Sequence, residues 1–484
     1  MTCGEHMKYE NTLLFIDGEW CSGSEKQTIP IFNPATDEEI GHVAKATVAD
    51  LDRAAASAEK AFHVWRRTPA VERGVTLRKA AGLLRDRLES IAHVLTLEQG
   101  KPLLEARAEI ASCADAFEWA AEEGRRLYGR VIPSRAAGVA QYVVRAPVGP
   151  VAAFTPWNFP ASQVAKKLAP ALAAGCSVIV KASEEVPRSA AAIITSLVDA
   201  GIPTGVVQLA YGTPDEISRH LIAHPAIRKI SFTGSVPVGK HLAALSGEQM
   251  KRTTMELGGH GPAIVFKDAD ISSAAALLVS GKYRNAGQTC AAPTRFMVHN
   301  DVYHEFVAAF VEKTQSLVVG NGLDATTQMG PLANERRGKL FDQFVDDARQ
   351  RGAKLMCGGE SLFTRGTFRQ PTVLANVDPS MRVMNDEPFC PIALISGFDN
   401  PNEAVAEANR LPFGLAGYAF TESSANAQFL AENLEVGMLS INHLGLALPE
   451  TPFGGVKESG YGSEGGLEST EGYLNTRFIT NKAY

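Results

Sequence analysis

The hydrophobic pattern of this 484-residue chain changes near residue 148. From residue 48 to about 130, Ala, Leu, Glu and Arg recur at helical spacing, and Thr47 precedes the first segment as a helix-entry residue. We expect long helices in this part. After residue 148, short apolar runs alternate with helical segments, which favours an α/β fold with a parallel sheet covered by helices on both faces.

The alternating part has two sections, and each is expected to form an α/β unit. The first combines expected strands at 149–154, 177–180, 206–209 and 229–232 with expected helices at 161–174, 187–200 and 214–223. The second begins at Pro262 and combines expected strands at 262–266, 295–299 and 392–396 with expected helices at 301–318, 335–352 and 402–409. Parallel sheets bind ligands at the C-terminal ends of their strands, so the chemistry is expected there.

Two further segments, 141–145 and 474–480, alternate like exposed strands. One lies between the helical part and the first sheet, and the other lies near the C-terminus. An exposed strand without a partner invites pairing with another subunit. These segments therefore predict a contact between copies of the chain.

Charge and cysteine usage narrow the class of protein. The chain has 47 basic and 53 acidic residues without long blocks of one sign, so no nucleic-acid partner is expected. Seven cysteines without a Cys-x-x-Cys pair indicate reduced thiols and a cytoplasmic location, and no metal site is expected. The first residues lack a basic region followed by an apolar stretch, and no apolar run reaches about 18 residues, so neither export nor a membrane is expected.

The first candidate for chemistry is Cys290, which follows Gly-Gln-Thr and lies 34 residues after Glu256. A thiolate adds to a carbonyl and forms a covalent intermediate, and a carboxylate can activate the water that releases it. The pair therefore suggests covalent chemistry on an aldehyde. Each residue also has a structural interpretation, because most buried cysteines are inert and a Glu before two glycines can simply end a strand.

A glycine-rich run at 234–240 matches a P-loop until His241, which stands where Ser or Thr would hold magnesium. Nucleotide hydrolysis is therefore not favoured. A helix that begins at Ser235, directly after a strand, can still direct free N–H groups at the pyrophosphate of a dinucleotide. Lys181 and Glu184 could hold a ribose diol, and Glu184 would repel a 2′-phosphate, although a solvated ion pair fits the same pattern.

Asn158 lies between Pro156 and Pro160, at the expected end of the strand 149–154. Rigid placement suits a side-chain amide that stabilises an oxyanion, with help from the backbone N–H of Cys290. A polar turn residue is the alternative interpretation.

These segments, together with Glu387-Pro-Phe389 and the glycine-rich run at 452–462, resemble the NAD(P)-dependent aldehyde dehydrogenase superfamily over nearly the whole chain. The resemblance implies an aldehyde dehydrogenase fold with three parts. These are a Rossmann-like cofactor domain (1–128 and 148–257), an α/β catalytic domain (258–458) and a small β oligomerisation domain (129–147 and 459–484). It also implies a homodimer or homotetramer.

The resemblance assigns roles to individual residues. Cys290 is the expected nucleophile, Glu256 the base that activates water, Asn158 the oxyanion donor, and Lys167 part of a proton relay. NAD is the expected cofactor, with NADP left open, and its expected site comprises Thr155, Pro156, Trp157, Lys181, Glu184, Gly234, Ser235, Gly239, Leu257, Glu387 and Phe389. Two positions depart from the family pattern: His260 stands where Lys is frequent, and Cys390 stands where Gly is usual.

The closer resemblance is to succinate-semialdehyde and α-ketoglutaric semialdehyde dehydrogenases, whose substrates carry a distal carboxylate. The expected substrate site comprises Phe159, Gln163, Lys166, Arg284, Thr289 and Phe453. Arg284 can bind a carboxylate with two hydrogen bonds, whereas Lys166, in place of a usual arginine, offers a point charge. The alternatives are an aldehyde dehydrogenase for a neutral or aromatic aldehyde, and a non-catalytic binding protein on this fold.

Overall fold

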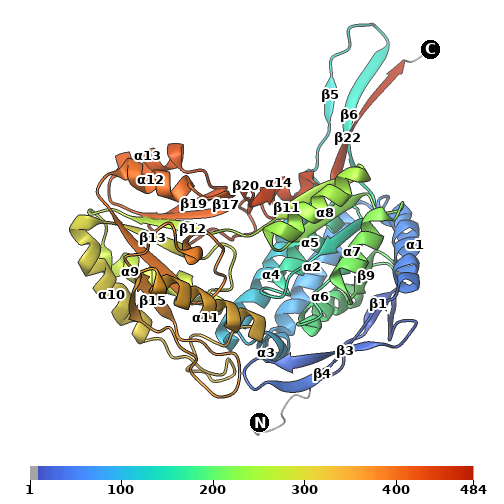
Figure 1. The fold of residues 1–484 in the computed structure, drawn as a ribbon. Helices are drawn as coiled ribbons and strands as arrows, with labels where there is room; N and C mark the ends of the chain where they lie inside the picture. Colours follow the sequence, from blue (N-terminus) through green and yellow to red (C-terminus); the bar gives the residue numbers. More distant parts are fainter. Residues whose placement is uncertain (1–8, 483–484) are drawn as a thin grey trace.

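The computed structural model describes residues 9–482 and has two α/β halves joined side by side, with a narrow sheet projecting from them (Figure 1). The predicted long helices are confirmed as α1 (Val48–Trp65), α2 (Ala70–Asp86), α3 (Leu88–Gln99) and α4 (Leu103–Glu123). Helix α1 begins where the sequence predicts, because Thr47 and Asp50 form a reciprocal capping box that satisfies two free N–H groups.

The first sheet has eight strands in the order β2-β1-β9-β8-β7-β10-β11-β21. Its strands are β1 (Leu14–Ile16), β2 (Glu19–Cys21), β7 (Val151–Phe154), β8 (Val178–Lys181), β9 (Val207–Ala210), β10 (Lys229–Thr233), β11 (Arg252–Glu256) and β21 (Gly460–Tyr461). The five strands from β9 to β11 in this order are parallel. The four predicted strands are confirmed as β7 to β10, whereas the hairpin of β1 and β2 was not predicted.

The strand order reverses between β7 and β10. Helices α5 (Ser162–Ala174) and α6 (Pro187–Asp199) connect β7 to β8 and β9 along one face of the sheet. Helices α7 (Pro214–Ala223) and α8 (Val236–Glu248) connect β9 to β10 and β11 along the other face, where α1 also packs. A reversal of this kind opens a crevice at the C-terminal strand ends, which is where α/β sheets bind ligands.

The second sheet has the order β14-β15-β16-β13-β12-β18-β19, and only β14 is antiparallel to its neighbour. Its strands are β12 (Gly261–Val265), β13 (Pro293–His299), β14 (Lys354–Cys357), β15 (Thr372–Ala375), β16 (Ile392–Phe398), β18 (Ala416–Phe420) and β19 (Met438–Ile441). The predicted second α/β section is therefore confirmed.

Helices cover both faces of the second sheet. Helices α9 (Ile271–Tyr283), α10 (Tyr303–Gln315) and α11 (Glu335–Gln350) bury apolar residues in one core cluster. Helices α12 (Pro401–Asn409) and α13 (Ser424–Asn433) bury theirs in a second cluster on the opposite face. The helices predicted at 301–318, 335–352 and 402–409 are confirmed, but α9 and α13 were not predicted.

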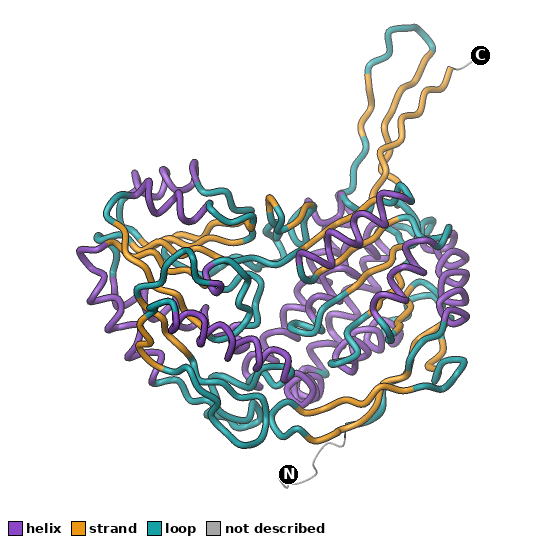
Figure 2. Tube along the Cα trace, in the orientation of Figure 1, coloured by secondary structure: helices purple, strands orange, loops and turns teal. Residues whose placement is uncertain are grey.

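The projecting sheet consists of β5 (Arg130–Ile132), β6 (Val139–Pro147) and β22 (Leu474–Lys482) (Figure 2). The predicted exposed strands are confirmed as β6 and β22, which pair with each other along nine residues. The sheet exposes apolar side chains, with Val131 85% and Phe478 57% exposed. Within residues 9–482, no helix combines the length and apolar character that crossing a membrane would require.

Shorter elements complete the chain. They are the hairpin of β3 (Thr28–Asn33) and β4 (Glu38–Ala44), the pair of β17 (Phe413–Gly414) and β20 (Val456–Lys457), helix α14 (Glu468–Glu471), and the single turns η1 (Gly124–Arg126), η2 (Arg284–Gly287), η3 (Asn300–Val302) and η4 (Arg382–Met384). Strand β21 returns the chain to the first sheet, where it pairs with β11 beside Glu256.

Candidate active site

The loop that carries Cys290 has a strained backbone. Asn285 and Ala286, in the turn η2, both have left-handed backbone angles, with φ of 50° and 52°. Such angles cost free energy in a residue with a Cβ atom, and they persist only where neighbours hold them. Gln99 on α3 donates from its Nε2 to the Oδ1 of Asn285 at 3.0 Å, so the first half of the molecule supports the loop.

Cys290 lines a cavity of about 310 Å³ between the two halves. Burial raises the pKa of Cys290 to about 12, and the negative charges of Glu387 and Glu256 act in the same direction. The ammonium of Lys166 acts in the opposite direction. The thiol is therefore neutral near pH 7, and its use as a nucleophile requires a nearby base.

Glu256, at the end of β11, is suited to be that base. Its side chain is 3% exposed, and neither carboxylate oxygen has a hydrogen-bond partner within the described chain. Burial raises the pKa of Glu256 well above its ordinary value, and the nearby Glu464 raises it further, whereas Lys167 and Lys166 lower it. A buried carboxyl group with free oxygens can take a proton from a thiol or from water.

Lys167 lies beside this carboxyl group and belongs to a buried polar cluster. Its Nζ contacts the Glu464 carboxylate, the Thr233 hydroxyl at 2.8 Å and the Ser231 hydroxyl at 3.2 Å. Sequence reasoning selected Lys167 but missed Glu464. Glu464 lies in a glycine-rich loop far along the chain, where no local pattern distinguishes it from a surface residue.

Asn158 is brought against the nucleophile loop. Its side chain is 4% exposed, and its Nδ2 donates to the carbonyl oxygen of Gln288 at 3.0 Å, two residues before Cys290. An amide NH2 group has two hydrogens, so one remains for a second acceptor. This geometry is compatible with the predicted oxyanion donor.

A second cavity, of about 570 Å³, lies at the reversal point of the first sheet. Seven of the eleven predicted cofactor residues line it: Thr155, Pro156, Trp157, Lys181, Glu184, Gly234 and Ser235. The structure thus brings together residues from the ends of β7, β8 and β10. The four remaining predicted residues, which are Gly239, Leu257, Glu387 and Phe389, do not line this cavity.

Those four residues instead form contacts near it. Phe389 has a left-handed backbone with φ of 47°, and its ring meets that of Trp157 edge-on at 5.6 Å between centres. The Glu387 carboxylate accepts from the Gly259 N–H at 3.0 Å, and burial raises the pKa of Glu387 to about 7. A Cβ atom on Gly239 would lie 2.3 Å from the end of the Leu257 side chain, so a larger residue there would displace Leu257.

The larger cavity has the chemistry that a dinucleotide needs. Lys181 and Glu184 form an ion pair of 2.5 Å at the end of β8. Helix α8 begins at Val236, one residue after the predicted start, and its N-cap Ser235 makes no side-chain capping bond, so the first N–H groups of the helix remain available to an anion. These residues therefore fit a ribose and a pyrophosphate.

All six predicted substrate residues line the cavity at Cys290: Phe159, Gln163, Lys166, Arg284, Thr289 and Phe453. The Oε1 of Gln163 and the Oγ1 of Thr289 are buried without a hydrogen-bond partner within residues 9–482. Leu444 and Leu446 from the loop 443–450 and the ring of Tyr418 also line it. Tyr418 was not predicted as a site residue, because nothing in the sequence of β18 indicates that the Tyr418 side chain faces this cavity.

Both cations of this cavity lie on aromatic rings. The Nζ of Lys166 is 4.2 Å from the centre of the Phe453 ring, and the guanidinium of Arg284 is 5.2 Å from that of Phe159. Across the described part of the chain, no carboxylate forms an ion pair with either cation within 4.0 Å. The rings hold the two cations, and their N–H groups stay free for an anionic ligand.

The two departures from the family pattern lie in the protein core. His260 is buried, and its ring nitrogens lie 2.6 Å from the Thr294 hydroxyl and 3.0 Å from the Val383 carbonyl oxygen. Burial lowers the pKa of His260 well below its ordinary value, so the ring is neutral near pH 7. Cys390 is fully buried in the core of the second half, as expected of a structural thiol.

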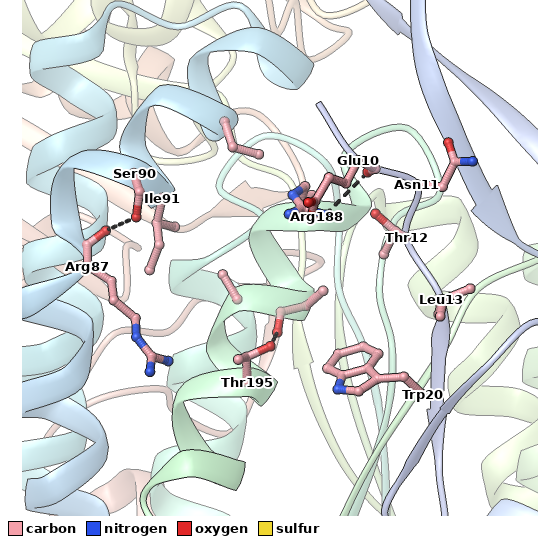
Figure 3. Close-up of a pocket in the computed structure, with 13 residues that line it drawn as sticks. Glu10, Asn11, Thr12, Leu13, Trp20, Arg87, Ser90, Ile91, Arg188 and Thr195 are labelled. Atoms are coloured by element: carbon pink, nitrogen blue, oxygen red, sulfur yellow. Dashed lines mark hydrogen bonds and ion pairs between the residues drawn. The ribbon is translucent and has the colours of Figure 1, made fainter. Parts of the chain in front are cut away.

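A separate pocket of about 370 Å³ lies between the N-terminal segment, α3 and α6 (Figure 3). Arg87 and Arg188 line it, with Trp20 at its side, and the two arginines pair with Asp199 and Glu10. None of the predicted site residues lines this pocket. The chemistry therefore belongs to the two cavities described above.

Comparisons with known proteins agree with this arrangement. The sequence model described as "Aldehyde dehydrogenase family" matches residues 20–479. The chain is 49% identical to the 4-(hydroxymethyl)benzenesulfonate dehydrogenase TsaD1 of Comamonas testosteroni, over 96% of this chain and 97% of that protein.

Two solved structures are similar along almost the whole chain. The succinate-semialdehyde dehydrogenase of Burkholderia pseudomallei is 40% identical, with a TM-score of 0.96 and 98% of each chain covered. The betaine aldehyde dehydrogenase of Staphylococcus aureus, solved in complex with NAD+, is 34% identical, with a TM-score of 0.94, and 98% of this chain and 95% of that one are covered.

Proposed function

We infer the reaction from the family to which this chain belongs, the aldehyde dehydrogenase family. The chain is an enzyme that oxidises an aldehyde, and NAD or NADP is its cofactor. For the substrate, we propose a short aldehyde with an anionic group at its far end. Succinate semialdehyde and α-ketoglutaric semialdehyde are the candidates that the sequence favours.

One observation carries the substrate proposal: Lys166 and Arg284 line the cavity at Cys290 and have no acidic partner within 4.0 Å in residues 9–482. Two cations that form no close ion pair make a cavity attractive to an anion, although the buried Glu105 also attracts Arg284 electrostatically. A guanidinium binds a planar carboxylate with two parallel hydrogen bonds, and an ammonium adds a point charge. The free Gln163 Oε1 can accept one further hydrogen bond from the substrate.

The names of the similar proteins support a substrate with an anionic group, but they do not favour one particular anionic group. One name contains a benzenesulfonate, and another contains a semialdehyde of succinate, which carries a carboxylate. The aromatic walls formed by Phe159 and Phe453 would accept a flat ring between the aldehyde and the anion. An aromatic aldehyde with a distal sulfonate is therefore the second candidate substrate.

The first half of the proposed reaction acylates the enzyme. Glu256 takes the thiol proton, and the Cys290 sulfur adds to the aldehyde carbon to form a thiohemiacetal. Glu256 then passes this proton through the neighbouring Glu464 to solvent, so it is ionised again before hydrolysis. The Nδ2 of Asn158 and the backbone N–H of Cys290 would donate to the resulting oxyanion. When bound, the nicotinamide cofactor would accept the hydride from this carbon, and Cys290 would then carry a thioester.

The second half hydrolyses the thioester. Glu256 accepts a proton from a water molecule, and the resulting hydroxide attacks the thioester carbon and releases the product as a carboxylate together with the Cys290 thiol. The proton on Glu256 can then pass to the neighbouring Glu464, which Lys167 contacts. Each turnover thus returns Cys290 and Glu256 to their starting protonation states.

Glu184 supports NAD over NADP. Its carboxylate is paired with Lys181 at the cavity wall, where a 2′-phosphate would meet a negative charge.

We also propose that the enzyme is cytoplasmic and that it assembles as a dimer or a tetramer. The exposed apolar face of the sheet of β5, β6 and β22 supports assembly, and the six described free cysteines support a reducing compartment.

The test of the proposed function is the initial rate of NADH formation with four aldehydes under identical NAD. They are succinate semialdehyde, α-ketoglutaric semialdehyde, 4-sulfobenzaldehyde and a neutral aldehyde of similar length. The expected result is a higher kcat/KM for at least one anionic aldehyde than for the neutral one. Equal kcat/KM values for all four aldehydes would refute the proposed preference for an anionic substrate. If none of the four aldehydes gave NADH, the oxidation proposed for these substrates would be refuted.

A further inference from the structure

A buried ion pair lies at the wall of the cavity at Cys290, where Glu109 is one of the lining residues. The Nζ of Lys101 is 2.6 Å from the Oε2 of Glu109, and both side chains are completely shielded from solvent. Lys101 follows α3, and Glu109 lies on α4. Taking two charges out of water is expensive, so such a pair calls for a reason beyond its mutual attraction.

Lys101 contacts the backbone of the predicted oxyanion donor. Its Nζ donates to the carbonyl oxygen of Asn158 at 2.8 Å and lies 4.0 Å from the centre of the Phe159 ring. The Nδ2 of Asn285 donates to the same carbonyl oxygen at 2.9 Å. This one oxygen therefore joins three segments: the end of α3, the loop after β7 and the nucleophile loop.

Glu109 holds the other end of the same loop. Its Oε1 accepts from the backbone N–H groups of Ala161 at 3.0 Å and Ser162 at 3.1 Å, where α5 begins. A carboxylate at the N-terminus of a helix accepts hydrogen bonds from free N–H groups and interacts favourably with the positive end of the helix dipole. Lys101 and Glu109 thus form one clamp that grips the loop at Asn158 and three residues later.

We propose that Lys101 and Glu109 are positioning residues that fix the Asn158 amide for the oxyanion of the thiohemiacetal. This inference rests on the proposed function, since it needs an oxyanion at Cys290. Oxyanion stabilisation depends on a donor held in place before the reaction, and a displacement of about 1 Å can cost about 100-fold in rate. The clamp supplies that fixation through the peptide of Asn158 and not through contact with the substrate.

A double-mutant cycle separates positioning from a general structural role. The variants are Lys101→Met, Asn158→Ala and the combination, and the measurement is the rate constant of the first NADH turnover at saturating NAD. If Lys101 acts through Asn158, Lys101→Met lowers this rate about 100-fold in the wild-type background and less than about threefold in the Asn158→Ala background. An equal loss in both backgrounds would overturn the inference.

Arg73 provides a matched control. It is also a buried cation that contacts α5, but at the opposite end, where its Nε donates to the Ala173 carbonyl oxygen at 3.1 Å. Arg73→Met should lower thermal stability and leave the first-turnover rate within about threefold of wild type. A loss as large as that of Lys101→Met would show that any damage to α5 has the same effect, and the inference would fail.

The variant Glu109→Gln provides a second test of the inference in case Lys101→Met does not fold. Glutamine keeps the size and the acceptor for Ala161 and Ser162, but it removes the negative charge that pairs with Lys101 and interacts with the dipole of α5. In the same cycle with Asn158→Ala, Glu109→Gln should lower the first-turnover rate constant in the wild-type background and leave it nearly unchanged in the Asn158→Ala background. Wild-type enzyme that forms no NADH from any aldehyde would instead refute the proposed function, together with this inference, whereas active enzyme with additive losses refutes only the clamp.

Discussion

The guanidinium of Arg284 lies 5.2 Å from the centre of the Phe159 ring. No carboxylate in the described part of the molecule forms an ion pair with this arginine within 4.0 Å, although the buried Glu105 attracts it electrostatically. Stacking on a ring fixes the plane of a guanidinium and leaves its N–H groups free. Arg284 is thus held next to Cys290 with its hydrogen-bonding capacity unused, which is the state expected of a receptor for an anion.

Replacement of Arg284 by leucine should act selectively on anionic substrates. We expect Arg284→Leu to lower kcat/KM for the preferred anionic aldehyde by about 10- to 100-fold, because hydrogen bonds to charged groups contribute ~1.5–3 kcal/mol. The loss should appear mainly in KM, since the interaction exists before and during the reaction. A neutral aldehyde of similar length should lose less than about threefold.

Arg87→Leu is the matched control for this prediction. Arg87 is a surface arginine that lines the separate pocket and pairs with Asp199. Its replacement should leave kcat/KM for both aldehydes within about twofold of wild type. If Arg284→Leu reduced the neutral and the anionic substrate equally, Arg284 would have a structural role instead.

The pH dependence of hydrolysis should follow Glu256. Burial and Glu464 raise the pKa of Glu256, and only the ionised form accepts a proton, so kcat should rise with pH through that raised pKa. Glu464→Gln removes a negative neighbour and should lower the pKa of Glu256. The rising limb of kcat against pH should then move to lower pH. A shift to higher pH, or none, would contradict the electrostatic coupling.

The sequence predicted the parts of this site that depend on local pattern. The strand ends that carry Asn158, Lys181 and Ser235 follow from alternating apolar runs, and the entry of α1 follows from the helix-entry residue Thr47. The strands β1 and β2 have three residues each, which is too short for a periodic signal, and they were missed.

Long-range contacts could not be predicted from pattern. Glu464 meets Lys167 across 297 residues, and Lys101 meets the Asn158 carbonyl across 57. Which buried residues face each other is decided by tertiary packing, and a single sequence carries no record of it. The six residues proposed for the substrate were found because a family resemblance supplied what the pattern alone did not.

Cys290 should be essential for oxidation but not for binding the cofactor. We expect Cys290→Ala to reduce NADH formation by at least about 10⁴-fold, because the covalent route is lost. Quenching of Trp157 fluorescence by NAD should persist, since Trp157 lines the proposed cofactor cavity and not the cavity at Cys290. NADH formation equal to that of wild type would contradict the nucleophile.

The other buried thiol beside the site serves as its control. Cys390→Ala removes a fully buried sulfur from the core of the second half. The free energy of unfolding should fall by ~1–2 kcal/mol because a small cavity forms, while kcat should stay within about threefold of wild type. A loss of activity as large as that of Cys290→Ala would assign Cys390 a role in the reaction.

Glu184 should determine the choice between NAD and NADP. Its carboxylate lies on the wall of the proposed cofactor cavity, paired with Lys181. Glu184→Ser removes a negative charge that would repel a 2′-phosphate and frees the Lys181 ammonium to attract one. We expect the ratio of kcat/KM with NADP to that with NAD to rise by about tenfold or more, equivalent to ~1.4 kcal/mol.

A variant of the neighbouring Glu185 tests whether the effect of Glu184→Ser on the NADP to NAD ratio depends on the position of the lost charge or on the net charge of the cavity. Glu185 lines the same cavity, but its carboxylate pairs with Arg336 and accepts a hydrogen bond from Asn334 at the start of α11. Glu185→Ser should therefore change kcat/KM with both cofactors by a similar factor and leave their ratio within about twofold of wild type. If Glu185→Ser raised the NADP to NAD ratio as much as Glu184→Ser does, the preference would reflect the overall charge of the cavity.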